Sequence, residues 1–143
     1  MEVPPSLETT LRHLCSVQLT LRTPSMVGEG PSGQRVIAEI EAMSVRGDRL
    51  HADLEGSAAA DWLTIANKVA KIDVRATLRT HDGALIYLQY KGRSDATNGL
   101  GSSPIVVAPT FETSDERYLW LNAVQAIGKG DLALRRYEWF EVQ

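Results

Sequence analysis

The sequence predicts an all-β domain with antiparallel strands, because alternating segments and turn residues follow one another along most of its 143 residues. Val36 and Ile40, for example, lie on one side of an extended chain and Glu39 on the other, which is the period of two expected for a strand. Turn residues recur about every 8 to 15 residues, and this spacing favours a barrel or a sandwich over alternating strands and helices.

Short turns and loops separate the expected strands. Gly47 and Asp48 indicate a turn, and the glycine-rich stretch from Gly99 to Pro104 interrupts the chain before the segment IVVAPTFET. Residues 94–103 are small and polar, so we expect this loop to be the most mobile part of the domain. The strands predicted in this way comprise residues 14–21, 34–46, 49–56, 71–79, 84–92, 105–113 and 131–143.

Residues 58–71 admit two interpretations. The segment AAADWLTIANKVAK is rich in helix formers, and propensity by itself predicts a helix. Asn67 and Lys68, however, could turn one strand into the next. The residues of this segment leave both interpretations open.

Residues 113–130 are equally ambiguous. Thr113 and Glu116 match a capping box, which favours a helix starting at this point. Trp120 and Asn122 alternate with leucines, as they would in a strand. A helix and a strand therefore both fit the pattern.

Residues 71–92 predict a β-hairpin whose register can be derived. The tripeptide HDG at residues 81–83 suits a type I turn followed by a glycine in the left-handed conformation, and this turn pairs Thr80 with Ala84. The pairs that follow are Val74 with Tyr90, Ala76 with Leu88 and Leu78 with Ile86 on one face, and Asp73 with Lys91, Arg75 with Gln89 and Thr77 with Tyr87 on the other.

The two faces of this hairpin differ in chemistry, and the pattern leaves open which face points inward. One face is aliphatic. The other is a polar strip formed by Asp73, Arg75, Thr77, Tyr87 and Gln89. If the aliphatic face is core, the polar strip is solvated, and an ion pair between Asp73 and Lys91 would contribute about 0 to 1 kcal/mol. If the polar strip is inside, its side chains line a cavity.

Composition excludes several classes of partner. The net charge is -3 and basic residues are scattered among acidic ones, which argues against nucleic acid or an anionic membrane. The first residues, MEVPPSLETT, lack the basic and apolar segments of a signal peptide, so we expect a cytoplasmic protein. The single cysteine, Cys15, is expected to be a small buried apolar residue.

Four stretches carry a resemblance to a known family. They are the run DVRATLRTHDGALIYLQYKG, the earlier pair Asp61 and Trp62, the strand that follows GEGPSGQR, and the later FETSDERYLWLN. In this order they resemble the domain-of-unknown-function 3237 (DUF3237) family, also called uncharacterised protein family 0311. The resemblance implies a closed, lipocalin-like, up-and-down antiparallel barrel of about eight strands, and it favours strands in both ambiguous segments. We expect one domain over residues 1–143, with a flexible tail at residues 1–9.

A polar strip inside such a barrel would supply groups for acid-base catalysis. Asp73 beside Arg75 would form a desolvated pair whose guanidinium could meet a substrate carboxylate or enolate, and Tyr87 would add a weak acid. Asp61 or Glu112 is the alternative base, and the rings of Trp62 and Trp120 could form a wall for an apolar ligand. The expected catalytic residues are Asp73, Arg75, Tyr87 and Glu112, and the expected ligand-binding residues are Asp61, Trp62, Thr77, Gln89, Trp120 and Asn122.

The expected function is that of a cofactor-independent enzyme for isomerisation, cyclisation or lyase chemistry on a small, partly apolar carbonyl compound. A non-catalytic binding barrel and an oligomeric scaffold with a filled barrel are the alternatives. We expect neither a cofactor nor a metal, since the three histidines lack metal-binding spacing and the glycines at residues 28–33 precede a strand rather than a helix. With the polar strip inside, the aliphatic face would be exposed, and a homodimer would be needed to cover it.

Overall fold

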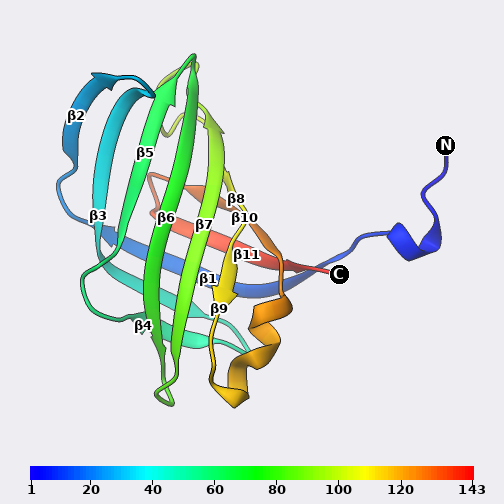
Figure 1. Ribbon diagram of the computed structural model, residues 1–143. Coiled ribbons are helices and arrows are strands. Elements are labelled where there is room, and N and C mark those ends of the chain that lie inside the picture. The colour runs from blue at the N-terminus through cyan, green and yellow to red at the C-terminus, as the bar shows by residue number, and fades with distance from the viewer.

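The computed structural model describes residues 1–143 and shows a closed antiparallel β-barrel (Figure 1). Its strands are β1 (Leu11–Leu21), β2 (Ser25–Gly30), β3 (Gly33–Arg46), β4 (His51–Leu54), β5 (Ala60–Ala66), β6 (Val69–Thr80), β7 (Leu85–Asp95), β8 (Ile105–Val107), β9 (Thr110–Glu112), β10 (Ala126–Asp131) and β11 (Arg136–Val142). Eight of them form the ring in the order β3, β1, β11, β10, β8, β7, β6, β5, and β5 pairs with β3 to close it. The predicted all-β, up-and-down barrel is therefore confirmed.

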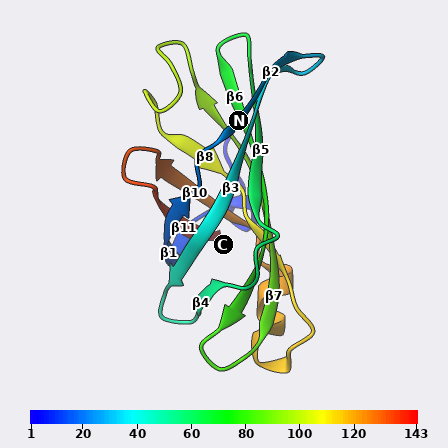
Figure 2. The same cartoon turned by 90° about the vertical axis from the view of Figure 1, so that its left-hand side faces the viewer.

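Three strands and two 3₁₀-helices lie outside the ring. β2 pairs only with β3 and stands away from the barrel wall at one end, while β4 joins β3 to β6 at the other end (Figure 2). β9 pairs with β7. The helix η1 (Pro5–Leu7) belongs to an N-terminal segment that extends away from the barrel with every side chain exposed, whereas η2 (Glu116–Ala123) packs beside β9 (Figure 1). No helix in the structure has the length and apolar character needed to cross a membrane.

The β6–β7 hairpin has the predicted register. Val74 lies opposite Tyr90, and Arg75 lies opposite Gln89. Gly83 has a φ of 94°, in the left-handed region, and the backbone N–H of Thr80 donates to the carbonyl of Ala84 at 2.9 Å. The turn chemistry therefore fixes the pairing, as inferred from the sequence.

The aliphatic face of this hairpin points into the barrel, so the hypothesis that the polar strip lines the lumen was wrong. Val74 and Tyr90 are 2% and 1% exposed, whereas Arg75, the residue after Val74, is exposed on the outer wall. The physical reason is burial: a closed ring has one inward face, and the aliphatic side chains gain more by leaving water than the polar strip would. The exposed aliphatic wall that a homodimer was expected to cover does not exist, and the oligomeric state stays a prediction.

Residues 58–71 form strands, as the resemblance favoured. Asn67 and Lys68 have φ values of 53° and 64°, both in the left-handed region, and they connect β5 to β6. This is the turn geometry that suits the twist of a two-residue hairpin. Tertiary pairing thus overrides the helix propensity of the alanine-rich run.

Residues 113–130 correct the expectation of a continuous strand. They begin with the turns of η2 and enter β10 only at Ala126. The N-cap is Asp115, whose side chain accepts a hydrogen bond from the backbone N–H of Arg117, rather than Thr113 of the predicted capping box. A helix forms because Tyr118 and Leu121 then reach the core from one side, as their exposures of 6% and 0% indicate.

Aromatic side chains fill part of the barrel. Trp139 is fully buried, with its ring 5.3 Å from Tyr90 and 6.2 Å from Phe111, measured between ring centroids. β10 makes room for these rings with glycine, because a Cβ at Gly130 would overlap the Tyr137 ring on the neighbouring strand. The sequence AIGKGD is therefore a strand whose inward positions are small by necessity.

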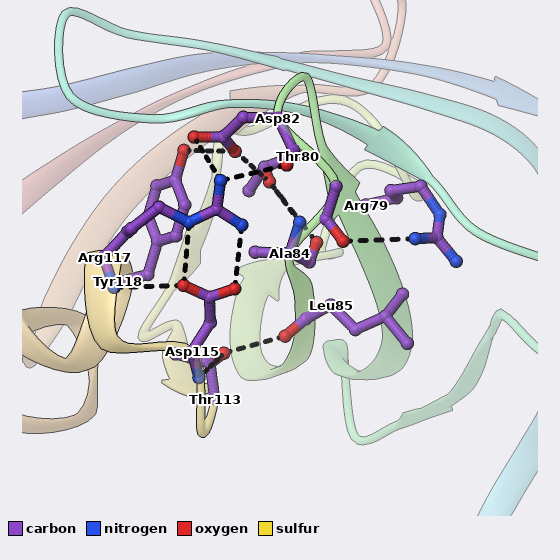
Figure 3. A network of polar contacts seen from close by, with 10 residues as sticks. Arg79, Thr80, Asp82, Ala84, Leu85, Thr113, Asp115, Arg117 and Tyr118 are labelled. Atoms are coloured by element: carbon purple, nitrogen blue, oxygen red, sulfur yellow. Dashed lines mark hydrogen bonds and ion pairs between the residues drawn. The ribbon is translucent and has the colours of Figure 1, made fainter.

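A polar network fastens η2 to the β6–β7 turn (Figure 3). Asp82 accepts hydrogen bonds from the hydroxyls of Thr80 at 2.6 Å and Tyr118 at 2.8 Å, and these bonds lower the pKa of its carboxyl. Arg117 forms ion pairs with Asp82 at 3.2 Å and with Asp115 at 2.9 Å. The network joins residues far apart in sequence and holds η2 against the β6–β7 turn.

We predict that Tyr118→Phe lowers the melting temperature at pH 7 by a few degrees, because it removes a hydrogen bond to a charged acceptor from a buried ring. Since the folded-state pKa of Asp82 is depressed, the contribution of this carboxylate is present above its unfolded pKa and is lost as the pH falls through the folded pKa. The difference between variant and wild type should therefore shrink in acid. Thermal unfolding of Tyr87→Phe, whose hydroxyl bonds Gln89 on the outer wall, is the control, and equal losses in the two variants would contradict the prediction.

Candidate active site in the barrel lumen

A cavity of about 230 Å³ remains inside the barrel where the aromatic packing ends. Its walls are mainly aliphatic side chains of the ring strands, and its opening lies among the β1–β2 loop, the β7–β8 loop and the β10–β11 turn. The lining residues are Leu19, Leu21, Arg22, Pro24, Val36, Ala38, Ile40, Asp61, Leu63, Ile72, Val74, Tyr90, Leu100, Ile105, Asp131, Leu132, Arg135 and Tyr137. Such a concave, largely apolar space with few polar groups is typical of a small-molecule site.

Three polar side chains face this cavity from within the barrel: Asp61, Tyr90 and Tyr137. The register explains why they meet. Asp61 on β5 lies opposite Val74 on β6, and Val74 lies opposite Tyr90 on β7, so the carboxyl and the phenol share one row of inward positions. Tyr137 reaches the same region from β11, with its ring centroid 5.8 Å from that of Tyr90.

Asp61 is a largely buried carboxyl group in mostly aliphatic surroundings. Burial raises its pKa from 3.8 to about 6, and this effect exceeds that of the backbone N–H of Asp73, which donates to Asp61 Oδ1 at 3.0 Å and lowers the pKa. The negative charge of Asp73 adds a smaller increase. Near neutral pH this group can therefore both accept and return a proton, as a general base requires.

The two tyrosines beside Asp61 are kept neutral. Burial raises the pKa of Tyr90 well above 10.0, with smaller contributions from the charges of Tyr137 and Asp61. Burial also raises the pKa of Tyr137, again with help from Asp61. The hydroxyl of Tyr90 and Nε1 of Trp139 are buried without a hydrogen-bond partner. Of these two orphaned groups, only the Tyr90 hydroxyl belongs to a residue lining the cavity.

The expected catalytic residues of the polar strip lie on the outer wall instead. Arg75 stacks over the ring of Trp62, with its guanidinium carbon 4.7 Å from the ring centroid, and Asp73 lines a separate outer groove. Tyr87 donates to Gln89 at 3.1 Å on the same outer face. Thr77 lies opposite Tyr87, two residues after Arg75, and shares their outward orientation. The placement of these residues in the lumen was wrong because the hairpin faces the other way.

The remaining expected residues also lie away from the cavity, except Asp61. Glu112 on β9 lies opposite Tyr87 outside the ring. Asn122 in η2 accepts from the backbone N–H of Thr113 at 2.8 Å, so it holds the loop rather than a ligand. Trp120 is covered by the guanidinium of Arg49 at 4.3 Å. The structure thus brings only Asp61 to the lumen from the set predicted by sequence.

Tyr90 and Tyr137 were missed by the sequence analysis. The derived register had placed Tyr90 opposite Val74 on the aliphatic face, and this position alone could have identified it as a polar group pointing inward. The alternation of Tyr137 and Trp139 in the last strand carried the same information. Both were overlooked because the search followed the polar strip.

No other group in the chain offers an obvious reactive centre. No cluster of three or more histidine, cysteine, aspartate or glutamate side chains is arranged to hold a metal ion. Cys15 is fully buried, and burial raises the pKa of its thiol to about 12, with a smaller effect from Glu138. The thiol is therefore protonated and inert at neutral pH, as expected for a structural cysteine.

Comparison with known proteins identifies the family and the fold. Residues 9–142 match the family described as "Protein of unknown function (DUF3237)". A beta-barrel like protein from Acinetobacter baumannii AYE has 28% sequence identity, a TM-score of 0.84 and full coverage of both chains. An enzyme from Penicillium herquei has 20% sequence identity and a TM-score of 0.78, and the match covers all of both chains. A protein with unknown function from Clostridium acetobutylicum ATCC 824 has 17% sequence identity and a TM-score of 0.85, and the match covers 95% of this chain and 100% of that chain. The last two show likeness of fold alone. No curated protein matches the chain.

We predict that Asp61→Asn stabilises the protein at pH 8 but not at pH 4. A carboxyl whose folded-state pKa is raised binds more protons when folded, so the free energy of unfolding falls as the pH rises from 3.8 to about 6. Asparagine keeps an acceptor for the Asp73 N–H and carries no charge, so it should gain up to about 3 kcal/mol at pH 8. Urea unfolding at both pH values measures the difference.

The control for this experiment is Asp53→Asn, which removes an exposed carboxylate paired with Arg46 at 2.8 Å. It should change stability by less than about 1 kcal/mol. A stability difference for Asp61→Asn that is the same at both pH values would show that this carboxyl is not desolvated.

Proposed function

Since the chain belongs to the DUF3237 family, we propose its function from the chemistry of the lumen: it binds a small, largely apolar carbonyl compound there and transfers a proton next to the carbonyl, with Asp61 as the acid-base group. One observation carries the proposal. Asp61, a buried carboxyl with a pKa of about 6, lines the same cavity as Tyr90, whose hydroxyl is buried without a hydrogen-bond partner. A base and an oxyanion donor on one cavity are the minimum required for enolisation.

The proton transfer balances without a cofactor. The Asp61 carboxylate removes a proton from the carbon next to the carbonyl, and the electron pair of that C–H bond moves into an enolate whose charge rests on the carbonyl oxygen. Tyr90 donates a hydrogen bond to this oxygen, and the apolar walls strengthen that bond by keeping water away. Protonated Asp61 then returns the proton to the same or another carbon, or the enolate expels a leaving group. Isomerisation, cyclisation and lyase cleavage share this step.

The size of the cavity limits the substrate. A cavity of about 150 Å³ suffices for benzene, so the volume of about 230 Å³ suits a bicyclic ring or a single ring with substituents. The aliphatic walls select an apolar body and the row of Asp61 and Tyr90 receives its carbonyl. The enzyme from Penicillium herquei supports the proposal to the extent that a protein of the same fold is an enzyme.

A non-catalytic binding barrel is the second candidate, because most of the cavity wall is aliphatic and offers affinity without chemistry. A filled scaffold is less favoured, since space remains in the lumen. Binding of a carbonyl compound without proton exchange would support the binder. Measuring hydrogen exchange next to the carbonyl of a bound ketone therefore distinguishes the enzyme from the binder.

We predict that the protein accelerates hydrogen-deuterium exchange at the carbons next to the carbonyl of 2-tetralone, a bicyclic ketone of suitable size, followed by proton NMR in D₂O. The enzymatic rate should rise as Asp61 ionises at a pKa of about 6 and level off above it. Asp61→Asn should lower the rate at least about 100-fold, since a positioned base contributes that much, and Tyr90→Phe should lower it while the pH profile is retained.

The matched control is Asp53→Asn, which removes a carboxylate from the outer surface and should leave the exchange rate unchanged. Circular dichroism verifies that each variant is folded. An exchange rate no higher than that of buffer, or one that survives Asp61→Asn, would overturn the catalytic proposal.

A further inference from the structure

The opening of the lumen carries charged side chains, in contrast to its aliphatic walls. Arg22, Asp131 and Arg135 line the cavity and are all exposed, so they form a charged rim around an apolar interior. Rim charges are in contact with water when the site is empty. They therefore act on whichever part of a bound ligand remains at the opening.

Two of these three charges are already engaged. Arg22 lies 3.7 Å from Glu39, measured between Nε and a carboxylate oxygen. Asp131 Oδ1 accepts a hydrogen bond from the backbone N–H of Leu134 at 3.1 Å and so supports the β10–β11 turn. The guanidinium of Arg135 takes part in no hydrogen bond and no ion pair within the chain.

Arg135 is held at the rim by its backbone. Its φ of 51° lies in the left-handed region, which residues with a Cβ rarely adopt. The backbone N–H of Leu19 donates to its carbonyl at 2.9 Å, and the side chain of Gln18 donates to the carbonyl of Leu134 at 2.9 Å. These bonds with the neighbouring strand hold the β10–β11 turn in place, and with it the position of Arg135 at the rim.

We propose that the ligand of the lumen is an organic anion, with its apolar ring body inside the barrel and its carboxylate at the rim on Arg135, assisted by Arg22. This inference rests on the lumen being the ligand site, as in the proposed function, and it narrows the substrate to the class of cyclic keto acids. Arg135 is the last residue before β11, and Tyr137, two residues further along the chain, lines the same cavity. A bicyclic ring bound in this cavity has its carbonyl near Tyr90 and Tyr137, with its carboxylate at the rim.

The test compares two probes that differ only by the carboxylate: 6-acetyl-2-naphthoate and 2-acetylnaphthalene. Isothermal titration calorimetry should show the acid binding about tenfold more tightly than the neutral ketone at low ionic strength, with the advantage reduced by salt. Displacement of the ketone by the acid shows that both occupy one site.

Variants assign the preference to Arg135. Arg135→Gln should bring the acid to the affinity of the ketone and leave the ketone unchanged, Arg135→Lys should keep part of the preference, and Arg22→Gln should reduce it less. Arg12→Gln, at an exposed arginine on β1 that does not line the cavity, should have no effect. All these positions are exposed, so the variants are expected to fold.

Each outcome decides the inference. Equal binding of the two probes to the wild type, or equal weakening of both by Arg135→Gln, would overturn the anion site while the ketone exchange of the proposed function could still hold. Tight binding of the acid that depends on Arg135, without any proton exchange, would support the anion site and remove the catalytic proposal. Binding of neither probe would overturn the anion site together with the lumen site.

Discussion

Closure of the eight-stranded ring is the constraint on which the rest of the structure depends. A closed sheet has no free edge and only one interior, so every ring strand must turn the same kind of face inward. The interior of this barrel is filled over part of its length by Trp139 and other rings, and the inward glycines of β10 make room for them. Beyond the rings, aliphatic side chains line the barrel without filling it. The same interior is therefore packed with rings over one part of its length and holds the cavity in another part.

Within that interior a small number of polar groups acquire properties they would not have in water. Asp61 keeps a raised pKa because the wall around it is aliphatic, and the buried hydroxyl of Tyr90 has no partner within hydrogen-bond distance. The outer wall holds many more charges, but solvent surrounds them, and exposed pairs contribute little to stability or reactivity. The chemistry of this protein is therefore expected where charges are few, with Arg135 as the link between lumen and solvent.

The sequence analysis found the hairpin and its register but misplaced the site. Period-two alternation and the HDG turn fix which residues are opposite one another, and both are local properties. The pattern left open which face of the hairpin points inward, and the catalytic hypothesis placed the polar strip in the lumen because clustered polar groups suggest function. Asp61 was included because it stands beside Trp62. Tyr90 and Tyr137 were missed, although the period-two alternation of the hairpin already put Tyr90 on the aliphatic face.

The sequence by itself determined most of the ring strands, several of the turns, the β6–β7 pairing and, through its resemblance, the barrel and the family; it did not show β2, the break between β8 and β9 or the turn at residues 132–135. These follow from local alternation and turn residues, which do not require knowledge of distant parts of the chain. Only the tertiary structure decided that the aliphatic face is inside, that residues 116–123 coil into η2, and that Asp61, Tyr90 and Arg135 share one cavity. Each of these depends on which segments meet across the barrel, because burial is set by neighbours that lie far away in the sequence.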